Sequence, residues 1–171
     1  MTDADFLHRA QLPPISNCAL SKNRKWPMSN TELTFDGVIF CDDIRQEMTG
    51  KYLIIGAYGG TVLLERYPTI IGIACLVQVS PGALGTIPFE FRMTGPHGAV
   101  YGVIGGSFDS ADSLTQNVLA IPSMAVSITL AGHLNLEYRP PSGEWRFVRR
   151  IEALTRAEFT ARTSANQNPS N

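Results

Sequence analysis

Charged residues are scarce in this chain, and neither sign dominates. They make up 17% of its 171 residues, with 14 Lys and Arg against 15 Asp and Glu. A chain with this balance has no overall basic field of the kind that draws a protein to nucleic acid or to an anionic membrane. The sequence therefore indicates no nucleic-acid partner and no membrane partner. Its hydrophobic content of 44% is sufficient for a folded domain with a sizeable core.

Cysteine is scarce as well. Cys18, Cys41 and Cys75 are too few and too scattered for a disulfide scaffold, and no CxxC motif occurs. We therefore expect reduced thiols in a bacterial-type cytosol. The first 14 residues lack a basic start followed by an apolar run, and no stretch of about 18 apolar residues occurs. We expect neither a secretory signal nor a membrane span, which predicts a cytoplasmic protein.

The residue patterns of metal sites and of nucleophilic catalysis are also missing. Zinc requires clusters of His and Cys, whereas His8, His97 and His133 lie far apart and none is near a cysteine in sequence. Cys41 and Cys75 fall in strand-like runs, where a small buried thiol is usually inert. The glycine-rich segments GAYGG and GVIGGS do not have the spacing of a phosphate-binding loop. We therefore expect no cofactor and no metal, and we identify no catalytic residue.

What the sequence has in abundance is a succession of short strand patterns separated by turn signals. In residues 87–94 (IPFEFRMT), for example, apolar and charged residues alternate with a period of two. Eight or nine such runs at a spacing of roughly ten residues predict an all-β fold. We expect a two-sheet antiparallel β-sandwich, Ig-like or similar, of about eight strands over residues 31–154. A closed barrel is the alternative.

Three finer predictions concern the arrangement of the strands. Gly59-Gly60, between two β-rich runs, indicates a hairpin turn. The apolar runs at residues 53–57 (LIIGA) and 70–77 (IIGIACLV) are typical of central strands. The Arg-rich last strand, residues 144–154, is typical of a sheet edge, where charge opposes unwanted pairing.

The two ends of the chain have little apolar periodicity. Residues 1–30 are interpreted as a flexible N-terminal arm or linker, with a short basic cluster formed by Lys22, Arg24 and Lys25. Residues 155–171 lose their apolar content and are predicted to form a short helical turn followed by a disordered tail.

The densest group of ionisable residues is the stretch FCDDIRQEMTGK at residues 40–51. Its Asp42 and Asp43 could form a carboxylate pair, with Arg45, Glu47 and Lys51 orienting a charged ligand. In an extended strand, however, neighbouring side chains point to opposite faces, so the two carboxylates are expected to diverge. Gly50-Lys51 indicates a turn. The stretch is open to three interpretations: a structural hairpin, a binding surface formed by these five charged residues, or a catalytic centre.

A wider pattern surrounds this stretch, over about 40 residues. A strand ending in Cys-Asp-Asp is followed by Arg and Glu, a Gly-Lys turn, an apolar strand ending in Gly-x-Tyr, and a proline. The residues concerned are Cys41, Asp42, Asp43, Arg45, Glu47, Gly50, Lys51, Gly56, Tyr58 and Pro68. This pattern resembles a small bacterial and phage family known only as a domain of unknown function. The resemblance implies a compact all-β domain and supplies no catalytic residues.

Three functional hypotheses follow. The first is a non-enzymatic β-sandwich binding or structural module of bacterial or phage origin, acting through a protein partner or self-association at its strand edges. The second is a small-molecule or metal-dependent enzyme that uses Asp42, Asp43, Arg45 and Glu47. That hypothesis requires these side chains to face a common cavity with His97, His133 or Asp109. The third, a phage anti-defence or regulatory protein, rests on analogy alone.

Overall fold

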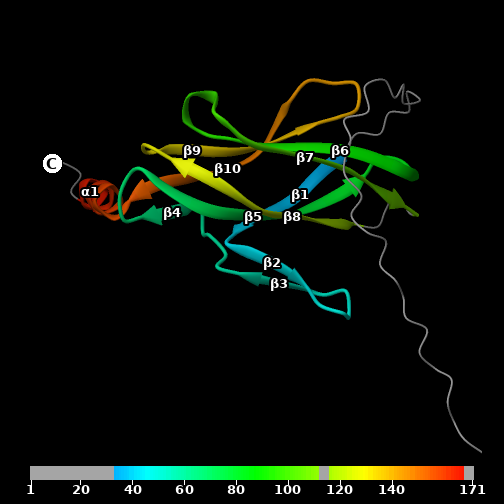
Figure 1. Ribbon diagram of the computed structural model, residues 1–171, viewed down its shortest axis with the longest axis horizontal. Coiled ribbons are helices and arrows are strands. Elements are labelled where there is room, and N and C mark those ends of the chain that lie inside the picture. Colours follow the sequence, from blue (N-terminus) through cyan, green and yellow to red (C-terminus); the bar gives the residue numbers. More distant parts are fainter. Residues whose placement is uncertain (1–32, 112–115, 168–171) are drawn as a thin grey trace, which may run out of the picture.

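The computed structural model describes residues 33–111 and 116–167. These residues form ten β-strands, a short 3-10 helix and one α-helix (Figure 1). The strands are β1 (Leu33–Cys41), β2 (Asp43–Gln46), β3 (Tyr52–Ile55), β4 (Thr61–Leu64), β5 (Thr69–Pro81), β6 (Gly85–Thr94), β7 (Val100–Ser110), β8 (Asn117–Ile128), β9 (Gly132–Arg139) and β10 (Arg146–Thr155). The 3-10 helix η1 (Pro96–Gly98) joins β6 to β7, and α1 (Arg156–Gln167) follows β10.

Two sheets pack face to face and enclose the core. The three-stranded sheet has the order β1-β5-β8, and the five-stranded sheet has the order β4-β10-β9-β6-β7. In Figure 1, β6, β7, β9 and β10 of the five-stranded sheet lie above β5 and β8 of the three-stranded sheet. The prediction of an all-β sandwich is therefore confirmed. One pair departs from the antiparallel expectation, because β4 runs parallel to β10.

The core is made by the alternate residues of both sheets that point inward. Three aromatic rings meet at its centre, those of Phe35, Phe91 and Tyr138, with centroids 5.1–5.9 Å apart. Phe35 belongs to one sheet and the other two belong to the facing sheet. Burying a large apolar side chain of this kind stabilises a fold by roughly 1.5–3 kcal/mol. The aromatic contacts therefore fix the two sheets against each other.

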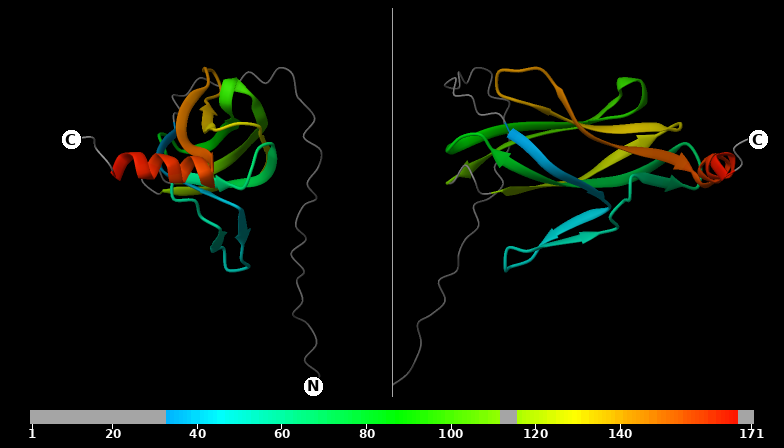
Figure 2. Two further views of the ribbon diagram at one scale, coloured as in Figure 1. Left: turned by 90° about the vertical axis from the view of Figure 1, so that its left-hand side faces the viewer. Right: turned by 180° about the vertical axis from the view of Figure 1, so that it is seen from behind.

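A third, two-stranded sheet lies outside the sandwich. It is the antiparallel hairpin of β2 and β3, hereafter the β2–β3 hairpin, which follows directly from the end of β1. Figures 1 and 2 show it on the far side of the three-stranded sheet from the five-stranded sheet. The hairpin contacts the sandwich through β2, which lies against β5 and β8.

Two of the three predictions about strand arrangement are wrong, and the third is half right. Gly59-Gly60 does not close a hairpin, because β3 pairs with β2 while β4 crosses to the five-stranded sheet. The run at residues 53–57 contributes to the outer hairpin, whereas the run at residues 70–77 lies in β5, the central strand of its sheet as expected. The Arg-rich β10 is not an edge strand, since it lies between β4 and β9.

The C-terminal helix is longer than the short helical turn predicted. Helix α1 runs for 12 residues, to Gln167, and so extends into the segment expected to be a disordered tail. Thr155 and Glu158 form a capping box at its start: Glu158 Oε2 accepts the Thr155 N–H over 2.8 Å, and Thr155 Oγ1 accepts the Glu158 N–H over 3.3 Å. Neither helix in the described part of the chain is long and apolar enough to cross a membrane. The predicted N-terminal arm lies outside the described residues.

Candidate functional site

The charged stretch singled out in the sequence folds as the β2–β3 hairpin and its tight turn. The Gly50 N–H donates to the Glu47 carbonyl over 2.9 Å, and the Glu47 N–H donates to the Lys51 carbonyl over 2.8 Å. Gly50 has a φ of +81°, a left-handed conformation that glycine adopts without a steric cost. This is the geometry of a three-residue hairpin loop. The predicted turn at Gly50-Lys51 is confirmed.

The two aspartates have different partners. Asp42 lies between β1 and β2, where its carboxylate accepts a hydrogen bond from the Tyr58 hydroxyl. A side chain on Gly56 would collide with this carboxylate, because an added Cβ would lie 1.8 Å from Asp42 Oδ2. Burial raises the pKa of Tyr58 above its usual value, and the neighbouring Asp42 adds to the shift. Asp42 therefore fastens the base of the hairpin to the segment that leaves it.

Asp43 and Arg45 lie on the same face of β2, as alternation predicted. Asp43 Oδ2 is 3.0 Å from Arg45 Nε, and Asp43 Oδ1 accepts the Ile44 N–H over 2.9 Å. The Arg45 side chain is largely solvent-accessible and that of Asp43 is partly so, and an ion pair this open to water contributes little to stability. Glu47 and Lys51 are exposed at the tip of the hairpin. The structure thus strings these four residues along the hairpin and its tip.

The opposite face of the hairpin points toward the sandwich. The pairing of Gln46 with Tyr52 and of Ile44 with Ile54 places these four side chains together on one face. Beneath the hairpin, Cys41, Ala74 and Leu76 are buried although they lie on the outer face of the three-stranded sheet. A sheet face open to water would leave them exposed. The base of the hairpin therefore covers this part of the sheet.

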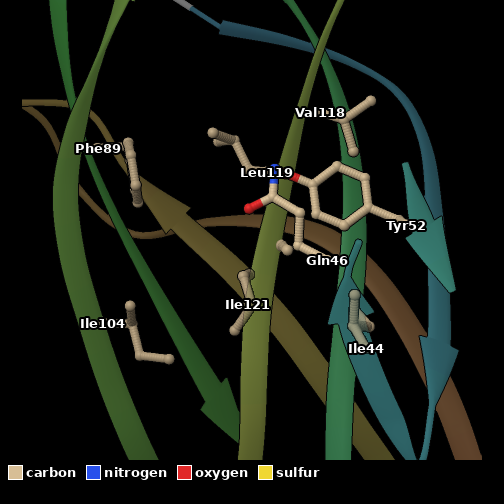
Figure 3. A pocket seen from close by; sticks show the side chains of 9 residues that line it. Ile44, Gln46, Tyr52, Phe89, Ile104, Val118, Leu119 and Ile121 are labelled. Carbon is tan, nitrogen blue, oxygen red and sulfur yellow. The ribbon is translucent and has the colours of Figure 1, made fainter. Parts of the chain in front are cut away.

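A pocket of about 350 Å³ lies between the hairpin and the edge of β8 (Figure 3). Nine residues line it: Ile44, Gln46 and Tyr52 from the hairpin, Phe89 from β6, Ile104 from β7, and Val118, Leu119, Ala120 and Ile121 from β8. In Figure 3 the Tyr52 ring extends from the hairpin toward β8. Its lining carries no charged side chain, so the pocket suits an apolar group.

The pocket follows the edge of a strand. Val118, Leu119, Ala120 and Ile121 are consecutive, and successive side chains of a strand point to opposite faces. All four can line one pocket only if it runs along the side of β8 and opens to both faces. β8 is an outer strand of its sheet, so this side has no paired strand in the described residues. Farther along, a Cβ added at Gly102 of β7 would lie 2.9 Å from Met124 Sδ, which shows that the sandwich closes there.

The other candidate groups lie elsewhere. His97 belongs to η1 between β6 and β7, His133 to β9 and Asp109 to β7, all on the five-stranded side of the sandwich. The structure does not bring them to the hairpin (Figure 1). Within residues 33–111 and 116–167, no three His, Cys, Asp or Glu side chains form a group that could hold a metal.

The thiols of Cys41 and Cys75 are both buried and unpaired by a disulfide. They occupy neighbouring strands, and Cys41 Sγ donates to the carbonyl of Ala74 over 3.7 Å. Burial raises the pKa of both thiols above the usual value, which disfavours the reactive thiolate. Both cysteines therefore have the structural character that the sequence predicted, while Cys18 lies outside the described residues.

Sequence reasoning missed the residues that line the pocket. Attention to the charges selected Asp43 and Arg45, whereas the pocket-lining residues Ile44 and Gln46 alternate with them in the same strand. The signal was present in the alternation, but which face of the hairpin turns toward β8 depends on contacts distant in sequence.

No family model matches the sequence, and the search of curated proteins gives no significant match.

Proposed function

We propose that this chain is a non-enzymatic binding module that captures an extended segment of a protein partner along β8, beneath the β2–β3 hairpin. The observation that carries the proposal is the apolar pocket that follows the outer edge of β8. The outward-facing backbone groups of an edge strand are available to hydrogen-bond another chain. An added strand would gain main-chain hydrogen bonds and specificity from its alternate side chains.

The lining of the pocket indicates which partner segment would fit. A strand laid beside β8 would direct one side chain toward Phe89 and Ile104, and the next toward Ile44 and Tyr52. Both directions lead to apolar surroundings. We therefore expect a partner segment with at least two consecutive apolar residues, rather than the apolar–polar alternation of a half-exposed strand.

The charged residues of the hairpin have a secondary role in this proposal. Glu47 and Lys51 adjoin the pocket-lining residues Gln46 and Tyr52 in sequence, and Asp43 and Arg45 lie on the outward face. Exposed charges at the rim of an interface chiefly affect the rate of association and its salt dependence. Together with Asp42, which shapes the hairpin, they form the surroundings of the site. The resemblance noted in the sequence supports a bacterial or phage setting, and the two buried thiols are compatible with a reducing cytoplasm.

Selection from a random peptide library on the immobilised protein tests the proposal. Selected peptides are expected to be apolar, and to shift the amide resonances of Val118–Ile121 and of the hairpin when added to isotopically labelled protein. Ala120→Glu, which places a charge in the pocket, should abolish this binding. Ala125→Glu is the matched control, since Ala125 is an exposed alanine of the same strand that does not line the pocket. Peptides that bind Ala120→Glu unchanged, or that shift other resonances, would contradict the proposal.

A further inference from the structure

The outer face of the five-stranded sheet, on the far side from the hairpin, carries two ordered rows of side chains. Strand pairing aligns one row across four strands as Phe147, Glu137, Arg92 and Val103. The neighbouring row has Arg139 beside Glu90 and Gly105, with Trp145 next to Arg139 because the adjacent pair is Arg146 with Tyr138. We call this surface, formed by these eight residues, the outer-sheet face.

The four central charges of the outer-sheet face alternate in sign in both directions. Arg92 Nε lies 2.5 Å from Glu137 Oε2, and Arg139 is paired with Glu90 in the next row. The Trp145 ring lies against both guanidinium groups, 4.4 Å from that of Arg92 and 4.8 Å from that of Arg139. Ion pairs and cation–π contacts therefore hold the charges in a fixed two-by-two pattern.

Apolar side chains lie at the two ends of the first row. Phe147 is 60% exposed and Val103 is 55% exposed, so two large apolar groups face water on opposite sides of the charge pattern. In the second row, the Trp145 ring lies over the arginines, and Gly105 at the β7 end has no side chain. Aromatic residues and arginine are enriched where proteins bind one another. The composition of this face is that of an interaction surface.

Each row is complementary to its own reverse. If the first row is turned over, Phe147 falls on Val103 and Glu137 falls on Arg92. If the second is turned over, Arg139 falls on Glu90. A two-fold axis parallel to the strands, between β6 and β9, performs both operations at once. We propose that two copies of this chain pair through the outer-sheet face about this axis.

The shape and size of the face are suited to such a pair. A twisted sheet is saddle-shaped, and a two-fold rotation about its strand direction superimposes a saddle on itself. This is why twisted sheets stack with their strands nearly aligned. The four strands that carry the outer-sheet face are spaced about 4.8 Å apart and are roughly 30 Å long, so the sheet surface around these eight residues has on the order of 600 Å² of flat area in all. Contact over this whole sheet surface would bury about 1,200 Å² in total, the lower end of the range for stable interfaces.

The charges favour a second copy over an unrelated partner. Every charge of the pattern keeps its partner within the chain and gains an opposite charge across the axis, so none becomes buried without compensation. Isologous two-fold pairs are also the commonest form of oligomer. The outer-sheet face and the pocket at β8 involve different surfaces, so the dimer does not depend on the proposed binding function, and each can fail alone.

Sedimentation equilibrium of the full chain from about 1 µM to about 1 mM tests the proposal. We expect the apparent mass to rise from 18.7 kDa toward twice that value. Val103→Glu should weaken association by at least about tenfold, because it places a charge against Phe147 of the second copy. Ile70→Glu is the matched control, an exposed apolar residue of the other sheet that should leave association unchanged. Thermal unfolding checks that each variant is folded.

A double exchange tests the axis itself. Arg92→Glu combined with Glu137→Arg preserves the ion pair within the chain and reverses the sign of one row. Under the proposed axis, position 137 of one copy faces position 92 of the other, so opposite charges still meet and the dimer should persist. Under an axis perpendicular to the strands, position 137 would face Arg139 and position 92 would face Glu90. Like charges would then meet, and the dimer should dissociate. Loss of the dimer in this folded variant would overturn the proposed axis. A wild-type chain that stays monomeric throughout, or a dimer that survives Val103→Glu and is abolished by Leu53→Glu in the hairpin, would overturn the proposal.

Discussion

At the scale of single residues, Asp42, Gly56 and Tyr58 form the contacts at the base of the β2–β3 hairpin. Tyr58 donates to Asp42, and Gly56 leaves the space that the carboxylate occupies. The Tyr58 N–H also donates to the Phe40 carbonyl over 2.8 Å, which fixes the returning segment against β1. Three of the motif residues thus serve to hold the hairpin in place.

Replacing Gly56 with alanine is therefore expected to destabilise the protein. Gly56 has a φ of +66°, and its new Cβ would displace the Asp42 carboxylate from Tyr58. The backbone conformation alone costs alanine about 1–2 kcal/mol, so the unfolding free energy should fall by at least that amount. Gly59→Ala is the control, because Gly59 has open space around it and no positive φ. Equal urea-unfolding curves for the two variants would show that the contact with Asp42 has no energetic importance.

At the scale of elements, the capping box explains why α1 is a full helix. Thr155-Arg156-Ala157-Glu158 has the S/T-x-x-E pattern that marks a helix start, and it was readable in the sequence. The pKa of Glu158 lies below its usual value, and the main cause is the hydrogen bond that its carboxylate accepts from the Thr155 N–H. The helix is further joined to the sandwich by Tyr67, whose hydroxyl donates to Glu158 Oε2 over 2.8 Å, and by an ion pair of 2.7 Å between Arg162 and Glu152.

The acid stability of α1 should therefore depend on Glu158. A carboxylate whose pKa is lowered in the folded state contributes stability above its unfolded pKa, and this stability is lost as pH falls through the folded value. The protection of the α1 amide groups against hydrogen exchange should decrease in acid, and Glu158→Gln should reduce this dependence on pH.

Thr155→Ala should open the first turn of α1 at all pH values. Thr163→Ala, in the middle of the same helix, should leave the first turn closed, since the Thr163 hydroxyl only donates to the Phe159 carbonyl one turn earlier. If both variants opened the first turn, the capping box would not be what holds it.

The local sequence pattern predicted where strands lie along the chain, but not which strands pair with one another. Alternation and turn residues are read within about ten positions, and on that basis β5, β6 and β10 were predicted close to where they lie. Pairing, by contrast, joins distant segments: β4 pairs with β10, about 90 residues later, and nothing within the apolar run of β4 specifies that partner. For the same reason, the turn at Gly50-Lys51 was predicted correctly, whereas the pocket behind the hairpin was not.

At the scale of the whole molecule, stability depends on the contact between the two large sheets. Ile73 is fully buried on β5, whereas Ile70 on the same strand is 71% exposed. Ile73→Val should lower the unfolding free energy by about 1 kcal/mol through the loss of a buried methylene. Ile70→Val should change it by less than about 0.5 kcal/mol. Urea titration measures both changes, provided that the slope of unfolding free energy against urea concentration is the same for each variant. Similar losses of unfolding free energy at the two positions would mean that the sheets do not bury β5 as described.

The parallel pairing of β4 with β10 also has a consequence for the order of folding. β10 lies between β4 and β9, so the five-stranded sheet cannot close until residues 146–155 have been synthesised and have moved into that gap. Until then β4, made more than 80 residues earlier, has no strand to pair with in its sheet, and the buried side chains of Val62 and Leu64 lack their cover. Contacts between such distant segments slow folding, because the chain must lose loop entropy before they form. The nascent chain should therefore remain open to chaperones and proteases until its last strand completes the sheet.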